Sequence, residues 1–504
     1  MMADALANAT DTKACVVGPG AADGAAAMFR ELFPSDAKAI LVEDPRTKSV
    51  AGDNVASRLK ASGVEVSEYV VNPDGSDFHA TYAKVEEVRE AIRGERGTGI
   101  GERRIVAVAV GSGTLNDLTK RASEELGQRY MVVGTAASMD GYTAYGAAIT
   151  KDGMKQTLPC KAPLGCIVDS AVAAFAPREM TASGYADLIA KIPAGADWML
   201  ADAIGSEAIH PLAWRLVQES LREALSNPSG CASGDEREVR KLCEGLVMSG
   251  FAMQAMGSSR PASGTEHQIS HYWDMESLSF GGKPVSHGFK VGIGTLFSTK
   301  ALEFLLRHDL SRLDVEKAVA AWPSTFDALK ATFPAIYGDR PAHIRRAEEE
   351  MSKKYSPPGK LREELSTFKR VWPELSERLK AQLMPFDEVR ENLRLAGAPV
   401  EPEQIGITRA RFRDTCRGVP YMRNRYFGID LIERLGLMDT LLDELFGPDD
   451  KDNFFNTETQ RLRDTECGEA GALPQSLKTS VPLCLCASVL KQNLQQGSCE
   501  CSST

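Results

Sequence analysis

Short apolar runs alternate with helix-like segments in the first third of the chain. The runs at residues 15–18, 39–44, 64–71 and 104–110 are typical of buried strands in a parallel sheet. Between them, segments such as 21–33 place their apolar residues at helical spacing. Strands separated by helices predict βαβ units, in which helices cover both faces of a parallel sheet.

The pattern changes at about residue 176. Long amphipathic segments, for example 239–256 and 361–383, replace the short runs as far as about residue 448. The chain therefore predicts an α/β part followed by an all-helical part. Beyond residue 448 the sequence is polar and weakly periodic, which is typical of a loosely ordered tail.

We expect four parts: a flexible N-terminus (1–12), an α/β domain (13–175), a helical domain (176–448) and a disordered tail (449–504). The tail is rich in cysteine. Its two Cys-x-Cys pairs offer ligands for a soft metal such as zinc, but exposed thiols without a function are the favoured interpretation. The tail cysteines are Cys467, Cys484, Cys486, Cys499 and Cys501.

Composition excludes several classes of protein. The 504 residues carry a net charge of -10, which disfavours a broad basic surface for nucleic acid. The chain has no run of 18 apolar residues, so we expect no membrane-spanning helix, and its first residues do not resemble a secretory signal. The remaining cysteines are scattered along the chain, which does not resemble a disulfide framework and favours reduced thiols. We therefore expect a cytoplasmic protein. These are Cys15, Cys160, Cys166, Cys231, Cys243 and Cys416.

Two glycine-rich turns follow predicted strands. The first turn contains Gly111 and Gly113 and leads into a helix, whose N-terminal N–H groups can bind an anion. The second covers residues 134–141, after the strand at 130–134. A tight turn without a ligand is the alternative for either one. Together the turns fit a dinucleotide that lies across the C-terminal edge of the sheet.

Three of the seven histidines fall in one short region: His267, His271 and His287. His267 and His271 are four residues apart, so they share one face of a helix. Imidazoles are common ligands for zinc and similar metals, and Asp187 offers a carboxylate among small and apolar neighbours. Packing or surface histidines are the alternative, and spacing does not decide which two would bind a metal.

These motifs, taken in order, resemble a known family. The segments 111–120, 135–144, 183–201, 258–271 and 287–295 look like those of the sn-glycerol-1-phosphate dehydrogenases, within the superfamily of iron-containing alcohol dehydrogenases, glycerol dehydrogenase and dehydroquinate synthase. The likeness covers about residues 13–448 and is closest to the bacterial branch named for its arabinose-operon member. It implies an N-terminal dinucleotide-binding domain with a parallel sheet, followed by an all-helical metal-binding domain.

The resemblance also implies roles for individual residues. Asp187, His267 and His287 match the metal ligands, for zinc or nickel. His271 matches a residue beside the substrate, and Asp140 matches a carboxylate that contacts it. The implied catalytic residues are therefore Asp140, Asp187 and His271.

The implied cofactor is NAD or NADP. Asp44 matches the acidic residue near the adenosine ribose, where its charge would repel a 2′-phosphate and favour NAD. Two positions depart from the family pattern: Ser112 replaces a glycine, and Ala144 replaces a serine that helps to hold the nicotinamide, with Thr143 beside it. The full cofactor set is Asp44, Gly111, Ser112, Gly113, Asp117, Thr135, Ser138 and Thr143.

The implied reaction is reversible reduction of dihydroxyacetone phosphate to sn-glycerol 1-phosphate, by hydride transfer at C2. The alternatives are a glycerol or other polyol dehydrogenase of the same superfamily and a catalytically inactive scaffold. The substrate's phosphate needs cations, for which Lys151, Lys155, Lys191 and Arg260 are candidates. We expect a small phosphorylated substrate as partner, no nucleic acid, and an assembly compatible with a homodimer.

Overall fold

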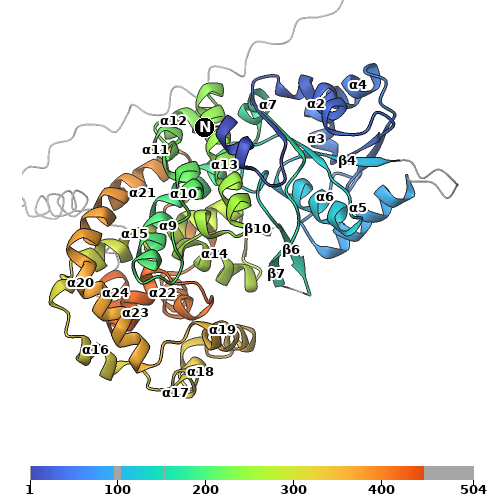
Figure 1. Cartoon of the computed structure of the whole chain (residues 1–504). Helices are drawn as coiled ribbons and strands as arrows, with labels where there is room; N and C mark the ends of the chain where they lie inside the picture. Colours follow the sequence, from blue (N-terminus) through green and yellow to red (C-terminus); the bar gives the residue numbers. More distant parts are fainter. Residues whose placement is uncertain (1, 96–103, 153, 448–504) are drawn as a thin grey trace, which may run out of the picture. The chain divides into compact units, whose positions relative to one another are not determined.

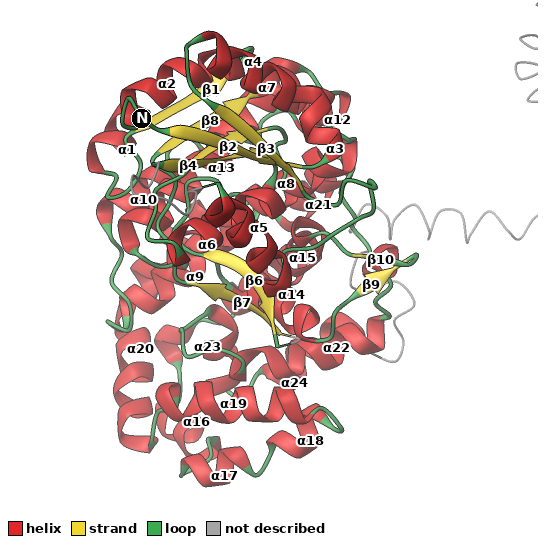
Figure 2. Ribbon diagram, turned by 90° about the vertical axis from the view of Figure 1, so that its right-hand side faces the viewer, coloured by secondary structure: helices red, strands yellow, loops and turns green. Residues whose placement is uncertain are grey.

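The computed structural model describes residues 2–95, 104–152 and 154–447. Its α/β part is built on a six-stranded sheet in which every neighbouring pair is parallel (Figure 2). In spatial order the strands are β1 (Ala14–Gly18), β8 (Gly165–Asp169), β5 (Met131–Gly134), β4 (Ile105–Gly111), β2 (Lys38–Glu43) and β3 (Val66–Val70).

Alternate residues of the sheet face two sets of helices. In β4, Val106 and Val108 belong to the core shared with α2 (Ala25–Leu32) and α4 (Asp53–Ala61). Ile105 and Ala107 belong instead to the core shared with α5 (Tyr82–Gly94) and α6 (Gly113–Glu125). A strand buried on both faces reads as a continuous apolar run, and this is why the sequence pattern predicts it. The α/β fold is confirmed.

Strand β8 was not predicted. It is fully buried between β1 and β5. The chain reaches it through the hairpin of β6 (Ala147–Lys151) and β7 (Met154–Leu158), which forms a separate antiparallel sheet. The remaining elements between β1 and α8 (Arg178–Ile189) are η1 (Ala21–Gly24), α3 (Pro45–Thr47), the π-helix η2 (Lys48–Gly52) and α7 (Ser170–Phe175).

Helices dominate the chain after the sheet (Figure 1). Those that carry or support the site described below are α8 (Arg178–Ile189), α9 (Lys191–Ala203), α13 (Glu236–Met256), α14 (Thr265–Met275), α15 (His287–Leu306), α23 (Gly428–Arg434) and the short turns η3 (Arg260–Ala262) and η6 (Val419–Tyr421). The others are α10 (Pro211–Gln218), α11 (Leu221–Ala224), α12 (Pro228–Ser233), α16 (Val315–Ala321), α17 (Phe326–Lys330), α18 (Phe333–Tyr337), α19 (Pro341–Lys354), α20 (Pro358–Gln382), α21 (Phe386–Leu395), α22 (Arg409–Gly418) and α24 (Met438–Phe446). A two-residue hairpin, β9 (Ser279–Phe280) with β10 (Lys283–Pro284), interrupts them.

Glycines let three of these helices approach closely. A Cβ added at Gly288 of α15 would lie 1.9 Å from the carbonyl oxygen of Ser183 on α8. A Cβ at Gly184 of α8 would lie 2.0 Å from the carbonyl oxygen of Ala137, in the second glycine-rich turn. A Cβ at Gly294 would lie 2.6 Å from the carbonyl oxygen of Glu266 on α14. Only glycine permits these backbone contacts, which bring α8, α14 and α15 together.

The N-terminus differs from the expectation of a flexible segment at residues 1–12. Residues Met2–Asn8 form helix α1, in which Ala5 is buried and Asp4 pairs with Arg215. Alanine, leucine and methionine favour helix, and packing of α1 against α13 and β1 orders it. The boundary between the predicted domains 13–175 and 176–448 stays a prediction.

No helix among the described residues is both long enough and apolar enough to cross a membrane. The predicted disorder of residues 449–504 and the proposed chelation by their Cys-x-Cys pairs lie outside the described residues.

Candidate active site

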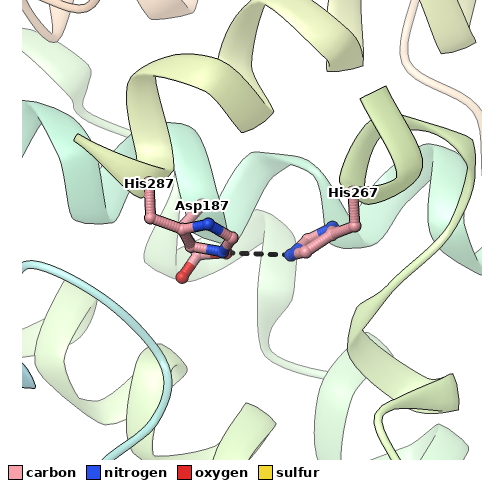
Figure 3. Close-up of side chains that lie close together, drawn as sticks. All are labelled: Asp187, His267 and His287. Carbon is pink, nitrogen blue, oxygen red and sulfur yellow. Dashed lines mark ion pairs between the residues drawn. The ribbon is translucent and has the colours of Figure 1, made fainter. Parts of the chain in front are cut away.

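Asp187, His267 and His287 come together from three helices; we name them the candidate metal triad (Figure 3). Each offers one ligand atom, and the three atoms lie within 4.8 Å of one another. His267 Nε2 is 3.5 Å from Asp187 Oδ1. The close backbone contacts described above place α8, α14 and α15 so that these side chains point toward one another (Figure 3).

Neighbouring side chains contact the Nδ1 atoms of both imidazoles, and His267 Nε2 faces Asp187. His267 Nδ1 lies 2.8 Å from Glu266 Oε1, and His287 Nδ1 lies 3.4 Å from the Ser270 hydroxyl. A carboxylate behind a ligating histidine is a usual feature of protein metal sites. Burial lowers the pKa of His287, so its imidazole is neutral, which is the form that binds a metal. One carboxylate and two imidazoles fit zinc or nickel chemically.

Lys191 lies between the two aspartates of the site, a role that the sequence analysis missed. Its Nζ is 2.7 Å from Asp187 Oδ1 and 2.9 Å from Asp140 Oδ2, and the ammonium is fully buried. Burial disfavours the charged lysine, but the two carboxylates outweigh it and raise the pKa of Lys191. Burial likewise opposes ionisation of Asp187, but Lys191 and His267 hold the pKa of that carboxyl well below its usual range. Both groups are therefore charged, and the four-residue spacing from Asp187 was the available signal.

Asp140 is fixed by its backbone as well as by its side chain. Its N–H donates to Asp187 Oδ2 at 3.1 Å, and its Oδ2 accepts from the Ser249 hydroxyl at 2.9 Å. No hydrogen bond from the described residues reaches its Oδ1, so that oxygen is left for a ligand. The structure thus brings Asp140 next to the candidate metal triad.

His271 lies beside the triad and is partly exposed to solvent. Its ring centre is 6.4 Å from those of His267 and His287. Its side chain is 39% exposed, and Nδ1 is 3.5 Å from Asp274 Oδ2. Asp274 in turn pairs with Lys290 and with Lys155.

The cofactor residues that the sequence suggested lie mainly at one edge of the sheet. Gly111 and Gly134, the last residues of β4 and β5, are directly paired. Asp44 follows the end of β2, the neighbour of β4, and its carboxylate accepts from the N–H groups of Arg46 and Thr47. C-terminal strand ends are where ligands of open parallel sheets bind.

The other suggested cofactor residues differ in how accessible they are. Ser112 precedes α6 and makes no side-chain hydrogen bond to the helix end. Thr135 is buried, Ser138 is half-buried, and Asp117 accepts a hydrogen bond from the N–H of Ala148. Thr143 is fully buried and donates to the carbonyl oxygen of Val247. The cofactor roles of all these residues stay predictions.

The suggested phosphate-binding cations are mostly engaged elsewhere. Lys151 lies over the Tyr82 ring at 4.3 Å, Lys191 pairs with the two aspartates, and Lys155 is 3.6 Å from Asp274. Arg260 is fully buried and donates to the carbonyl oxygens of Tyr426 and Asp197 at 3.0 and 2.8 Å.

Comparison with known proteins identifies the family. A family model described as iron-containing alcohol dehydrogenase matches residues 16–177. Glycerol-1-phosphate dehydrogenase (NAD(P)+) of Halalkalibacterium halodurans is 35% identical over 261 residues, which cover 51% of this chain and 62% of that protein. The protein of the same name from Methanothermobacter thermautotrophicus is 32% identical over 279 residues, covering 55% of this chain and 75% of that one. The chain belongs to the glycerol-1-phosphate dehydrogenase family.

A solved structure has a similar fold. The crystal structure of glycerol dehydrogenase from Schizosaccharomyces pombe superposes with a TM-score of 0.53 at 13% identity, covering 90% of this chain and 98% of that one. The likeness concerns the fold alone: a parallel-sheet part followed by helices. The matched segment spans less than two thirds of the Halalkalibacterium relative.

Proposed function

We propose that the protein is a metal-dependent NAD(P)H oxidoreductase that interconverts dihydroxyacetone phosphate and sn-glycerol 1-phosphate. The observation that carries this proposal is the convergence of Asp187, His267 and His287 within 4.8 Å. Family membership supports the substrate and the cofactor, because the relatives are named glycerol-1-phosphate dehydrogenase (NAD(P)+).

Asp187 and the Nε2 atoms of His267 and His287 would hold the metal. A bound divalent cation supplies Lewis-acid stabilisation of an oxygen that gains negative charge when hydride reaches C2. The charged Asp187 and the neutral His287 are already in the protonation states that ligands require.

Asp140 would orient the substrate. Its Oδ2 is occupied by Ser249 and Lys191, so Oδ1 is the acceptor for a substrate hydroxyl. Because Lys191 contacts both aspartates, it fixes the relative positions of the substrate-binding and metal-binding carboxylates. Such fixed geometry is how a protein contributes to hydride transfer, whose chemistry resides in the nicotinamide.

His271 would exchange a proton with solvent. It is partly exposed, it lies next to the triad, and Asp274 holds one of its ring nitrogens. An imidazole in this position can pass a proton between a substrate oxygen and water. Asp44 would face the adenosine ribose, where its negative charge favours NAD over NADP.

The test compares substrates and variants. Purified protein should oxidise NADH with dihydroxyacetone phosphate more efficiently than with dihydroxyacetone. Preference for the unphosphorylated ketone would contradict our proposal and indicate a polyol dehydrogenase. Absence of turnover with either ketone would indicate a catalytically inactive scaffold.

Two histidine variants test the assignment of roles. His267→Ala should lose bound metal in elemental analysis, whereas His271→Ala should keep the metal and lose turnover. His79→Ala, at an exposed position, is the control and should change neither. The reverse pattern for the first two variants would exchange their roles.

A further inference from the structure

Two arginines converge on one hydroxyl group near the candidate metal triad. Arg423 and Arg425 lie in the loop between η6 and α23, and each donates to the Ser259 hydroxyl oxygen at 3.3 Å. Ser259 directly precedes η3, in the motif that leads into α14. Two guanidinium groups that share a neutral acceptor repel each other, so the arrangement favours an anion beside them.

The local charge balance is positive. Arg425 Nε is 3.5 Å from Glu207, but Arg260 Nε shares the same carboxylate at 3.4 Å. Among the described residues, no carboxylate lies within ion-pair distance of Arg423. Glu350 accepts from the N–H of the neighbouring Asn424, and its charge and that of Glu207 oppose the loss of the Arg423 proton. Burial and the charge of Arg425 outweigh them and lower the pKa of Arg423 to about 9, so its guanidinium is still protonated at neutral pH. A phosphate monoester, with close to two negative charges, would neutralise both arginines.

The arginines lie close to the substrate side of the site. The turn η6, which precedes them, packs against α14, the helix of His267 and His271. Partial burial of the ring is the main cause that lowers the pKa of His271, and the charge of Arg423 acts in the same direction. In the proposed function His271 lies beside the substrate, so Arg423 is within electrostatic reach of that position.

The backbone that carries the arginines is held in place. Arg260 donates to the carbonyl oxygen of Tyr426, and Asp197 accepts from the N–H of Gly428 at 2.6 Å. Lys354 Nζ donates to the carbonyl oxygen of Arg425 at 3.1 Å. A site on fixed backbone binds an anion at a lower ordering cost.

We propose that Arg423 and Arg425, with the Ser259 hydroxyl, bind the phosphate group of the substrate. The proposal rests on the proposed function, because it assumes a phosphorylated three-carbon ketone. It explains how the site would tell that substrate from its unphosphorylated analogue. Under this proposal Lys151, Lys191 and Arg260 do not bind the phosphate and keep the structural contacts described above.

Inorganic phosphate is the first probe, because its binding can be measured without turnover. Phosphate should raise the melting temperature of the wild-type protein, and Arg423→Gln should lose most of that shift. Arg413→Gln, which removes an exposed arginine paired with Asp443, is the matched control and should respond as wild type. Arg423→Lys keeps the charge and should recover part of the shift. An equal response in wild type and Arg423→Gln would overturn the subsite.

Kinetics then distinguish the source of the phosphate. Inorganic phosphate should compete with dihydroxyacetone phosphate and not with NADH, and its inhibition constant should rise about 30-fold or more in Arg423→Gln, as expected for a lost partner of a charge pair. The preference for dihydroxyacetone phosphate over dihydroxyacetone, as a ratio of kcat/KM, should fall by a similar factor. Competition with NADH, or equal losses for both ketones, would refute a substrate-phosphate role. A wild-type protein inactive on dihydroxyacetone phosphate would refute the proposed function, while the melting experiment would still test the anion site.

Discussion

Replacing Lys191 by methionine tests the electrostatic balance of the site. Methionine keeps most of the length of the side chain and removes the charge that lies 2.7 Å from Asp187 and 2.9 Å from Asp140. The ammonium is fully buried, and the two carboxylates are 0% and 14% exposed, so water cannot replace the lost partner. Breaking a buried ion pair in this way typically costs about 3–5 kcal/mol. We expect a loss of this size in the free energy of unfolding of the metal-free protein.

The same variant should respond to metal more strongly than the wild type. In the metal-free protein, Lys191 supplies the positive charge beside Asp187. A divalent cation held by Asp187 would supply that charge instead, so saturating zinc should recover much of the stability that Lys191→Met loses. The assay is guanidinium unfolding followed by tryptophan fluorescence, with chelator and with zinc. Lys353→Met removes a lysine from an exposed pair with Glu349 and should cost less than about 1 kcal/mol in either condition. If Lys191→Met unfolded like this control in chelator, the charge argument would be wrong.

Two further predictions concern the framework around the site. Burial raises the pKa of Glu43 from 4.5 to about 7, so the folded state holds a proton that the unfolded state releases, and stability is lost as the pH rises between these values. Between pH 5 and 8.5 the free energy of unfolding of Glu43→Gln should therefore rise by about 2.5 kcal/mol relative to that of the wild type. The measurement is denaturant unfolding of both proteins at each pH. If both free energies changed with pH in the same way, the burial argument would be contradicted. Gly288→Ala would place a Cβ 1.9 Å from the carbonyl oxygen of Ser183 and push α15 away from α8. It should lower both the melting temperature and the metal content, and a variant with wild-type metal content would show that the helix contact does not build the site.

The sequence predicts those strands of the α/β fold whose apolar pattern matches their burial in the structure. Strand β4 is buried on both faces, so its apolar run is unbroken and easily recognised. Strand β8 is equally buried but only five residues long, and it follows a hairpin that belongs to a different sheet. Of its two neighbours in the sheet, β1 lies near the start of the chain and β5 is separated from β8 by the β6–β7 hairpin. The strand is therefore recognised only from its pairing in the folded structure. Helix α1 escaped prediction for a similar reason, because contacts with α13 order it.

The candidate site divides in the same way. Asp187, His267 and His287 could be suggested from residue type and from resemblance, and the structure brings all three together. Lys191 is distinguished only by its neighbours: a lysine four residues after an aspartate usually forms a surface pair, whereas here it is buried between two carboxylates. Arg423 lies far beyond the last of the motifs, which ends at residue 295, and has no sequence signature. Its relevance comes from its convergence with Arg425 on Ser259.

Metal removal tests the central claim most directly. Protein stripped with chelator, and shown by elemental analysis to be metal-free, is assayed for NADH oxidation with dihydroxyacetone phosphate before and after addition of zinc or nickel. We predict that turnover disappears with the metal and returns when about one equivalent of metal per chain is restored, as expected for one Lewis-acid site. Undiminished turnover by the metal-free protein would contradict the account.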